Sequence, residues 1–525
     1  MLRKSKITAV ILALFMAFFS FTPLMVEAGK LTPPGETFTP GEWFLGATPP
    51  NYDPNKPPIV FVQGKNGTAS SWYGETSYHG PNDMYDSAYN AGYQTVFVQL
   101  YDAAGNGSYS QWDNGRLLAT MLEQIYQRFG KKVNIVAHSK GGPDTQAALV
   151  HYGAHRYVGN VITLGSPHHG SHLADLSYSW WAGWLASLLG QRDDGTYSLQ
   201  VGEMANFRSV TDSHPNAKLN KYYTVAGTDW GPMFSALYTG GMYLSSYGSN
   251  DGLVNVWSTK LPYGVHLFTD SNLDHDNIRV GSKVFSRIEP KLRTATINST
   301  NQNLATYQSE QPIMSSSNQT VLGGPLVKNK WDKQTFVVDT KTDGDISVLT
   351  ATSDTQVKLI SPSGKVYTNK NSNVVTGTDQ FYFIGAHVQT FQLKQMEVGT
   401  WSIQLKSKAK KDAYFMVTQL KQAESISLEL PGKVKQTKAK FRLMQPTKQP
   451  SNSEAVSFTI RVVDKEGSLV AETHSTKKLD AASFEENLPE VKQSGVYNVT
   501  IDVKGKNKEG KEMNRTIVRS VYIEK

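Results

Sequence analysis

A short strand-turn-helix segment with a serine at its apex constrains the fold of this chain more than any other feature. Residues 133–137 are mostly apolar and β-branched, which is typical of a strand buried on both faces. Ser139 follows, then two glycines, then residues 144–150, which predict a helix. Small residues at Ala137 and Gly141 let the two arms of a sharp turn approach closely, and the strain points the serine hydroxyl outward. The usual pattern is G-x-S-x-G, and here alanine replaces the first glycine.

On this pentapeptide alone, a serine at an ordinary turn is an equally good interpretation, so the surrounding sequence decides. Predicted strands at 58–62, 94–100 and 157–164 alternate with predicted helices at 83–90 and 115–129. The alternation favours an α/β fold with a parallel sheet covered by helices on both faces. Functional loops of such sheets gather at the carboxyl ends of the strands. We therefore expect Ser139 and the glycine-rich loop 63–67 at the same edge.

The N-terminus has the pattern of a secretory signal at residues 1–28. Three basic residues precede an apolar run at 7–21, and residues 26–28 fit a small-x-small cleavage site, so we expect the mature chain to begin at Gly29. The apolar run is shorter than the roughly 20 residues that a membrane-spanning helix needs. The sequence therefore predicts a secreted, extracellular protein that is soluble.

The composition narrows the possible chemistry. The 525 residues include no cysteine, which excludes disulfides, thiol catalysis and Cys-ligated metal sites. This length suggests two to four domains. The net charge of +8 comes mostly from lysines after about Leu292, without the arginine-rich or aromatic-interleaved motifs of nucleic-acid binding. We expect no nucleic-acid partner. Attraction to an anionic cell wall and a merely solvated surface are both compatible with the charge.

Three motifs, in this order, resemble those of secreted bacterial lipases of the α/β-hydrolase fold. They are the elbow Ala137-His-Ser-Lys-Gly141, the run at 163–175 that begins Thr-Leu-Gly-Ser-Pro-His-His-Gly, and Asn250-Asp-Gly-Leu-Val254. The elbow with alanine first is shared with Bacillus-type lipases and some bacterial polyester depolymerases. The resemblance covers about residues 58–290. It implies an α/β-hydrolase catalytic domain that hydrolyses esters through a serine, a histidine and an acid.

The resemblance also orders the candidate catalytic residues. In this fold the nucleophile comes first in the chain, then the acid, then the histidine, which leaves two of the twelve histidines. His275 lies in a loop before the predicted last helix, where the family carries its base, whereas His266 lies in a strand-like alternation. We predict catalysis by Ser139 and His275. Asp251, in the Asn-Asp-Gly motif, is the predicted acid, and Asp229 is the alternative. The ordinary interpretation of Asp229 is an aspartate that caps the backbone of its own turn.

The tetrahedral intermediate of acyl transfer carries a negative oxygen, which backbone N–H groups stabilise. The elbow implies that one donor is the N–H of Lys140, the residue after the serine. The second donor is expected to be the N–H of Lys65, which follows Gln63 and Gly64. Related lipases commonly have His-Gly there, so Gln63 departs from the family pattern and its hydrogen bonding is open.

The most hydrophobic stretch of the expected mature chain is 173–190. Trp180, Trp181, Trp184 and Leu185 recur at helical spacing and form one broad apolar face. A core helix is the ordinary interpretation of such a face. However, the opposite face is small and polar, and the segment falls where this fold inserts a cap. We predict a cap or acyl-binding surface, which would favour long-chain or polymeric esters.

We expect no cofactor and assign no metal site. Related secreted lipases often bind structural calcium near the catalytic histidine, and Asp270, Asp274 and Asp276 could supply oxygen ligands. Their spacing around His275 does not reproduce the ligand pattern of those lipases, so the acids are equally well interpreted as polar loop residues.

The second half of the chain has a different character. Helical periodicity ends, and short alternating runs predict strands. Its S-P-S-G element at 361–364 and G-T-W-S-I element at 399–403 resemble the small β-sandwich that follows many secreted bacterial hydrolases. The predicted organisation is a signal peptide at 1–28, an α/β-hydrolase domain at 29–291, a linker at 292–325, a β-sandwich at 326–421 and an immunoglobulin-like β-sandwich at 422–525. Attachment of these two modules to a substrate or cell wall, and a passive spacer role, both remain open.

Taken together, the residues and the resemblance predict a monomeric secreted serine ester hydrolase, most similar to a triacylglycerol lipase. Its partner is expected to be an ester or lipid at an interface. A polyester (polyhydroxyalkanoate) depolymerase is the nearest alternative, because the elbow and the attached modules suit a polymer equally well. A surface-binding protein that has lost catalytic activity is the alternative from another class.

Overall fold

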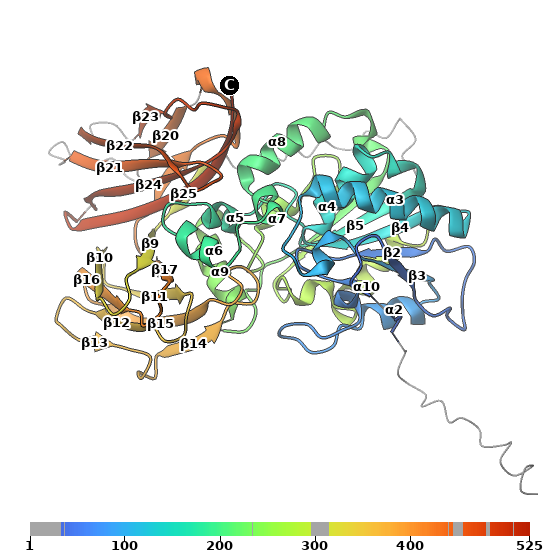
Figure 1. Ribbon diagram of the computed structural model, residues 1–525, viewed down its shortest axis with the longest axis horizontal. Helices are drawn as coiled ribbons and strands as arrows, with labels where there is room; N and C mark the ends of the chain where they lie inside the picture. The colour runs from blue at the N-terminus through green and yellow to red at the C-terminus, as the bar shows by residue number, and fades with distance from the viewer. Residues whose placement is uncertain are drawn as a thin grey trace, which may run out of the picture.

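The computed structural model describes residues 33–525 except 36, 234, 296–313, 439, 445–454, 479–482 and 508. The predicted signal peptide lies outside these residues. Two lobes make up the described chain: a helix-covered sheet, and two β-sandwiches stacked one above the other beside it (Figure 1). Across the described ranges, no helix combines the length and the apolar character needed to traverse a bilayer.

The first lobe is built on a seven-stranded sheet. Its strands lie in the order β1 (Trp43–Leu45), β3 (Thr95–Val98), β2 (Ile59–Val62), β4 (Val133–His138), β5 (Val158–Leu164), β6 (Lys221–Gly227) and β7 (Val265–Asp270). Only β1 runs antiparallel to its neighbour, and the other pairs are parallel. The central strands are buried throughout because both faces are covered, as their near-continuous apolar sequences predict. The α/β class is confirmed.

Helices cover the two faces of this sheet. One face carries α3 (Gln111–Phe129) and α4 (Gly141–Val150), with α8 (Val201–Thr211) packed against α4, and the other face carries α2 (Met84–Asn90) and α10 (Gly281–Ile288) (Figure 1). The α3 helix begins at Ser110, whose hydroxyl accepts from Asp113 N–H, and ends at Gly130 in the left-handed conformation. These local signals set the helix ends, and burial of Leu118 and Leu122 sets its orientation.

The hydrophobic stretch 173–190 forms two short helices instead of the one helix that its periodicity predicts. They are α5 (His172–Ser177) and α6 (Gly183–Leu188), and two more short helices nearby are α7 (Asp194–Ser198) and α9 (Ala236–Leu244). Between α5 and α6, the Ser179 hydroxyl donates to Leu176 O at 2.7 Å and accepts from Ala182 N at 3.2 Å. Such local side-chain bonds to the backbone compete with helix continuation, so the apolar face is divided in two.

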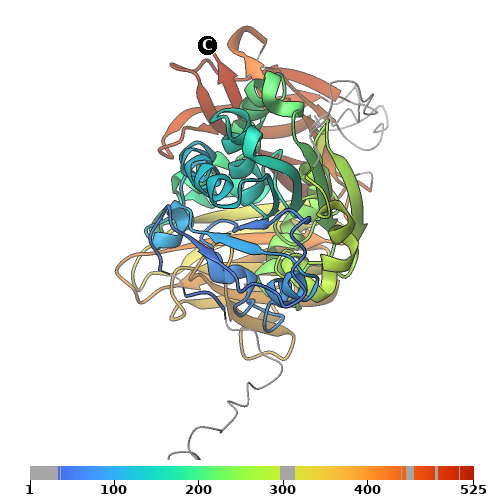
Figure 2. The same cartoon turned by 90° about the vertical axis from the view of Figure 1, so that its right-hand side faces the viewer.

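The second lobe holds two antiparallel sandwiches, which lie one above the other also in the perpendicular view (Figure 2). The first packs β10 (Asp332–Val338), β16 (Gly399–Lys406), β12 (Gln356–Ile360) and β13 (Val366–Tyr367) on β14 (Val374–Thr378), β15 (His387–Met396), β11 (Thr342–Thr350), β17 (Asp412–Leu420) and β9 (Gln319–Leu326). The second packs β23 (Ser483–Asn487), β20 (Lys440–Met444), β18 (Ile426–Glu429) and β8 (Met314–Ser317) on β19 (Lys433–Lys435), β25 (Glu512–Glu524), β24 (Gly495–Lys506), β21 (Ala455–Val463) and β22 (Leu469–Lys478).

The predicted linker at 292–325 is wrong at its C-terminal end. Strands β8 and β9 both lie inside that range, and β8 pairs with β18 of the second sandwich while β9 pairs with β17 of the first. The two sandwiches are therefore interleaved in the chain. The polar composition of β8, with three consecutive serines, gave no strand signal. Its strand conformation depends on backbone pairing with a partner more than 100 residues away.

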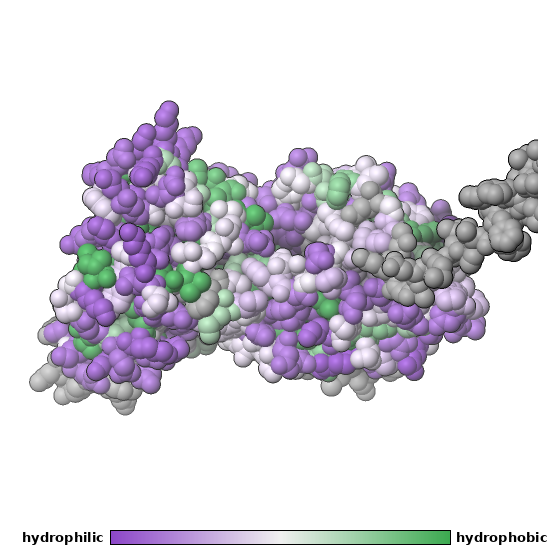
Figure 3. Space-filling model, turned by 90° about the horizontal axis from the view of Figure 1, so that it is seen from below, coloured by the Kyte–Doolittle hydropathy of each residue, from purple (hydrophilic) through white to green (hydrophobic). Residues whose placement is uncertain are grey.

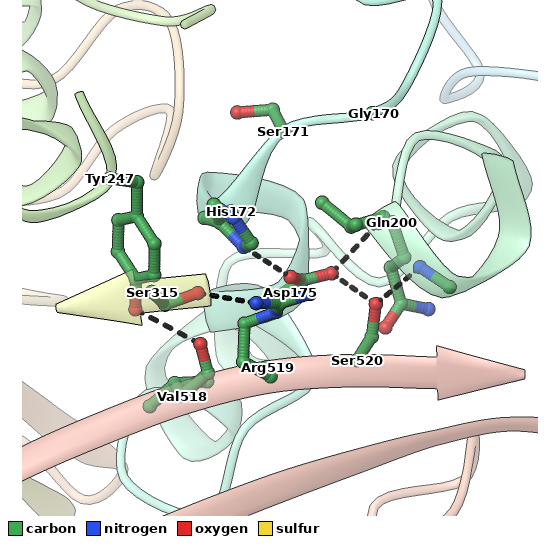
Figure 4. A network of polar contacts seen from close by, with 12 residues as sticks. Gly170, Ser171, His172, Asp175, Gln200, Tyr247, Ser315, Val518, Arg519 and Ser520 are labelled. Atoms are coloured by element: carbon green, nitrogen blue, oxygen red, sulfur yellow. Dashed lines mark hydrogen bonds and ion pairs between the residues drawn. The ribbon is translucent and has the colours of Figure 1, made fainter. Parts of the chain in front are cut away.

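Buried polar contacts join the two lobes (Figure 4). Asp175 of α5 accepts from His172 Nδ1 at 2.8 Å, from Val201 N at 2.9 Å and from the Ser520 hydroxyl of β25. The His172 ring stacks on Tyr247 with 3.9 Å between centroids, and the Tyr247 hydroxyl donates to the backbone oxygen of residue 518 in β25. A buried carboxylate with several donors orients its neighbours, so this network fixes the second sandwich against helices α5 and α8.

Viewed from below, hydrophobic residues at the surface form small separate groups (Figure 3).

Candidate active site

Ser139 stands at the tip of the turn between β4 and α4, as the sequence predicts. Its φ is 52°, in the left-handed region that a non-glycine residue adopts only where the surroundings enforce it. The enforcing contacts are backbone bonds: Ser139 N donates to Leu164 O, and Gly142 N donates to Ser139 O, both at 3.0 Å. A Cβ at Gly141 would lie 2.5 Å from Gln63 O, which explains the small residue after the serine.

His275 and Asp251 converge on this serine from two other loops. The Ser139 hydroxyl lies 2.9 Å from His275 Nε2, and His275 Nδ1 lies 2.9 Å from Asp251 Oδ2. All three side chains are at most 9% exposed. The second oxygen of Asp251 accepts from Leu253 N at 3.1 Å and Val254 N at 2.8 Å, which orients the carboxylate. The arrangement has the nucleophile-base-acid geometry of serine hydrolysis.

Hydrogen bonds to its backbone also hold His275 in place. His275 N donates to Asp251 O at 2.9 Å. The neighbouring His138 approaches the backbone oxygen of His275 with its Nε2 at 2.9 Å, and the two rings lie 4.8 Å apart. Burial, and then the neighbouring His275 and Arg279 side chains, lower the pKa of His138 well below its usual value. A neutral His138 donates one hydrogen bond to the loop that carries His275 and adds no charge beside it.

The structure places the two alternative residues away from the serine. His266 lies on β7, where its ring nitrogens meet the hydroxyls of Thr224 at 3.0 Å and Thr269 at 2.8 Å. Asp229 accepts from Gly231 N at 3.0 Å, as an aspartate in a turn does. Neither contacts the relay from Ser139 to Asp251.

Gly165, at the end of β5, is a functional position that the sequence did not single out. Its φ is +58°, and a Cβ there would lie 2.9 Å from Asp251 Oδ2 and 3.3 Å from His275 Nδ1. A methyl group would therefore enter the hydrogen bond between acid and base. Its place in the lipase-like run at 163–175, directly after an apolar strand, is the sequence signal that points to this position.

We expect Gly165→Ala to lower kcat by at least about 100-fold, since a displacement of about 1 Å in a catalytic group has an effect of this size. Gly130→Ala is the matched control, because Gly130 has a φ of +64° and open space where the methyl would be. Both variants carry the same backbone strain, so the difference in kcat measured on a soluble ester reports the displaced relay. Equal kcat values would contradict the role of Gly165.

The two expected oxyanion donors lie beside the hydroxyl. Lys65 follows β2 and Lys140 precedes α4, and within the described residues neither backbone N–H has an acceptor in the protein. A Cβ at Gly64 would lie 2.9 Å from the Ser139 Cβ, so the Lys65 loop runs against the nucleophile. Gln63 departs from the family pattern but is satisfied: its amide fits between Val98 O at 2.9 Å and Leu100 N at 2.8 Å, which ties the loop to the end of β3.

A cavity of about 280 Å³ opens beside Ser139 and His275. Apolar side chains line most of it, among them those of Pro167, Leu173, Leu199, Leu253, Val254, Phe381 and Ile384. The cavity lies between α5 and the loop after β2 that carries Lys65. Its size and lining suit an acyl chain that leaves an ester carbonyl at the serine.

Part of the cavity wall comes from the first β-sandwich. The loop between β14 and β15 brings residues 380–382 and 384 to the cavity. The Phe381 ring packs at a tilt against the ring of Tyr78 of the first lobe, with 5.6 Å between centroids, and the Tyr382 hydroxyl donates to Leu173 O. Buried Asp379 shapes the loop by accepting from Phe381 N and Tyr382 N at 2.8 and 2.9 Å. The module that the sequence left without a role therefore supplies part of the wall of this cavity.

The four residues predicted as the substrate surface do not line this cavity. Leu185 is buried among side chains of the first sandwich, and Trp184 is 54% exposed. Trp181 donates from Nε1 to Asp502 at 3.2 Å, and Trp180 lies 5.4 Å from the Arg461 guanidinium, both in the second sandwich. The apolar face of the segment serves as an interface between lobes. Only its first turn, at Leu173 and Ala174, reaches the cavity.

The acids near His275 each have protein partners. Asp270 pairs with Arg287, Asp274 with His79, and Asp276 with Arg279. Burial raises the pKa of Asp274, and donors that include His79 offset part of the rise. Among the described residues, no group of three or more histidines and acids is placed to hold a metal ion.

Comparison with known proteins shows the family to which the chain belongs. No protein-family model matches it. The crystal structure of the Bacillus licheniformis lipase BlEst2 in its propeptide form is 34% identical, covers 93% of this chain and 98% of that chain, and superposes with a TM-score of 0.75. The mature form of the same lipase is 48% identical over 49% of this chain and 100% of that chain, with a TM-score of 0.45. The chain belongs to the family of this Bacillus lipase, the lipase-like hydrolases of the α/β-hydrolase fold.

Proposed function

We propose that this protein is a secreted carboxylic ester hydrolase that acts on lipid esters through a Ser139–His275–Asp251 triad. The observation that carries the proposal is the continuous relay of two 2.9 Å contacts from the serine hydroxyl through the imidazole to a carboxylate. It stands at the carboxyl edge of the parallel sheet, beside an apolar cavity. Membership of a lipase family agrees with this chemistry.

The mechanism follows from the geometry. His275 Nε2 accepts the hydroxyl proton while Ser139 Oγ attacks the ester carbonyl carbon, and Asp251 keeps the proton on Nδ1 and stabilises the imidazolium. The N–H groups of Lys65 and Lys140 stabilise the oxyanion. The imidazolium then protonates the leaving alcohol. Water, deprotonated by His275, hydrolyses the acyl-enzyme by the same steps in reverse.

A fluorophosphonate probe on the purified full-length protein tests the proposal. We expect labelling of the wild type, and none of Ser139→Ala, because the probe needs an activated serine. Turnover of short p-nitrophenyl esters should fall by about 10⁶-fold in the variant. A folded wild type that is neither labelled nor active would favour the surface-binding alternative.

The cavity favours a lipase over a polyester depolymerase. In the chain with both sandwiches in place, residues 380–382 and 384 form part of the wall of a pocket of about 280 Å³, which accommodates one acyl chain more readily than a continuous polymer. Parallel assays on emulsified triglyceride and on polyhydroxyalkanoate decide between them. Faster release of product from the polymer would support the depolymerase.

A second proposal concerns the state of this chain. The propeptide form of the Bacillus lipase BlEst2 aligns with 93% of this chain, and here the first sandwich forms part of the cavity wall. We propose that the full-length chain is a precursor in which this sandwich restricts substrate entry. Phe381→Ala should raise kcat/KM for long-chain esters by about tenfold and leave that for acetate esters within about twofold, since only large acyl chains meet the Phe381 ring. Equal values for both ester classes in variant and wild type would show that the loop does not limit access.

A further inference from the structure

The two expected oxyanion donors come from different segments of the chain. Lys65 belongs to the loop after β2, and Lys140 belongs to the turn before α4. A donor stabilises the oxyanion only when it lies about 2.7–3.1 Å from it. The spacing between the two segments is therefore part of the catalytic geometry, and whatever fixes that spacing acts on the reaction.

Asp102 holds the first segment. It follows β3 in a short 3₁₀ turn and is 3% exposed. Its Oδ2 accepts from Asn66 N at 3.2 Å and from the Ser108 hydroxyl at 2.7 Å, and its Oδ1 accepts from Tyr109 N at 3.1 Å. Asn66 has a φ of 55° and comes directly after Lys65. Asp102 thus anchors the strained peptide that follows the first donor.

Asp144 holds the second segment. It lies in the first turn of α4 and accepts from the Lys140 ammonium at 2.9 and 3.0 Å. The Lys140 side chain is fully buried. Burial alone would lower the pKa of Lys140, but Asp102 and Asp144 more than offset this and raise it above its usual value. Burial raises the pKa of Asp144 to about 7, although Lys140 lowers it in part, and the two contacts between these side chains tie the turn that carries the second donor to α4.

Asn114 of α3 joins the two anchors. Its Nδ2 donates to Asp102 Oδ1 at 2.9 Å and to Asp144 Oδ2 at 3.0 Å, and its Oδ1 accepts from Tyr101 N at 3.2 Å. The amide is fully buried. A chain of hydrogen bonds thus runs from the Lys65 loop through two carboxylates and one amide to the Lys140 side chain.

We propose that Asn114, acting with Asp102 and Asp144, is a positioning residue that sets the distance between the two oxyanion donors. The inference rests on the proposed function. An amide whose two protons bond two carboxylates in a buried site fixes the distance between them. Because each carboxylate holds one donor segment, loss of the amide lets these segments move apart. Stabilisation of the transition state then falls, while binding of the ester through the apolar cavity is retained.

The chain supplies a matched control for the test. Asn134, at the start of β4, is also fully buried and also makes three hydrogen bonds, donating to Leu292 O at 2.8 Å and Thr294 O at 3.0 Å and accepting from Asn160 N at 2.8 Å. It lies at the opposite edge of the sheet from Ser139. Asn114→Ala and Asn134→Ala remove the same side chain from two fully buried sites, and in each site that side chain makes three hydrogen bonds.

Both variants are measured as the full-length protein, by kcat and KM on a soluble ester and by inhibition with an alkyl boronic acid, which forms a tetrahedral adduct on the serine. We expect Asn114→Ala to lower kcat about 10- to 100-fold and to raise the inhibition constant of the boronic acid by a similar factor. KM should stay within about threefold of the wild-type value. Asn134→Ala should lower Tm by a similar amount but leave kcat within about threefold.

Equal kcat in the two variants, or a change confined to KM, would overturn the positioning role. If Asn114→Ala does not fold, Ser108→Ala removes one donor to Asp102 and should lower kcat several-fold at unchanged KM; an unchanged kcat there would equally contradict the inference. A wild type without fluorophosphonate labelling or turnover would instead refute the proposed function, and the positioning role with it.

Discussion

Replacing His275 by alanine should lower kcat by about 10⁴- to 10⁶-fold, whereas His266→Ala should leave it within about threefold. The imidazole of His275 is 2.9 Å from the Ser139 hydroxyl, and no other base reaches that proton in the described structure. The His266 ring bonds the threonine hydroxyls of Thr224 on the neighbouring β6 and of Thr269 on its own strand. Burial lowers the pKa of His266 to about 4, so its loss removes a neutral, satisfied side chain.

The measurement is kcat on a short p-nitrophenyl ester, with circular dichroism and Tm to confirm folding of both variants. His266→Ala serves as the matched control because it removes the same ring from the same domain. A large loss in His266→Ala together with retained activity in His275→Ala would show that the base assignment is wrong.

Asp251→Asn should lower kcat by about 10⁴-fold, as loss of the orienting carboxylate does in a serine triad. An amide nitrogen facing Nδ1 favours the tautomer with its proton on Nε2, which cannot accept the serine proton. The remaining amide oxygen still accepts from Leu253 N and Val254 N, so the turn keeps its conformation.

Asp229→Asn is the comparison for this variant. Asp229 bonds the backbone of its own turn, and asparagine can make the same bond, so we expect kcat to remain within about twofold. Both substitutions replace one carboxylate oxygen by an amide nitrogen in a loop of the same domain. A loss in Asp229→Asn as large as that in Asp251→Asn would remove the distinction between the two acids.

The local features of the fold were predictable from the sequence. The apolar run at 133–137, the small residues beside Ser139 and the periodicity of α3 are properties of neighbouring residues, and steric and hydrophobic rules over such short distances determine strand, turn and helix. The order of the three lipase-like motifs then predicted the α/β-hydrolase fold, which the structure confirms. The predicted triad residues stand in contact, while their catalytic role stays a prediction.

Tertiary contacts decided what the local sequence could not. The Trp180 to Leu185 face looks the same whether it covers a substrate or a neighbouring sandwich, because periodicity reports burial and not the identity of the partner. The serines of β8 gave no strand signal, since pairing with a distant strand supplies their order. Phe381 and Asn114 carry no motif, and their importance arises from contacts with residues 12 to about 300 positions away. The sequence alone predicted the elements of the α/β sheet and the place of Ser139 at its turn, whereas the cavity wall and the spacing of the predicted oxyanion donors depend on which remote segments pack together.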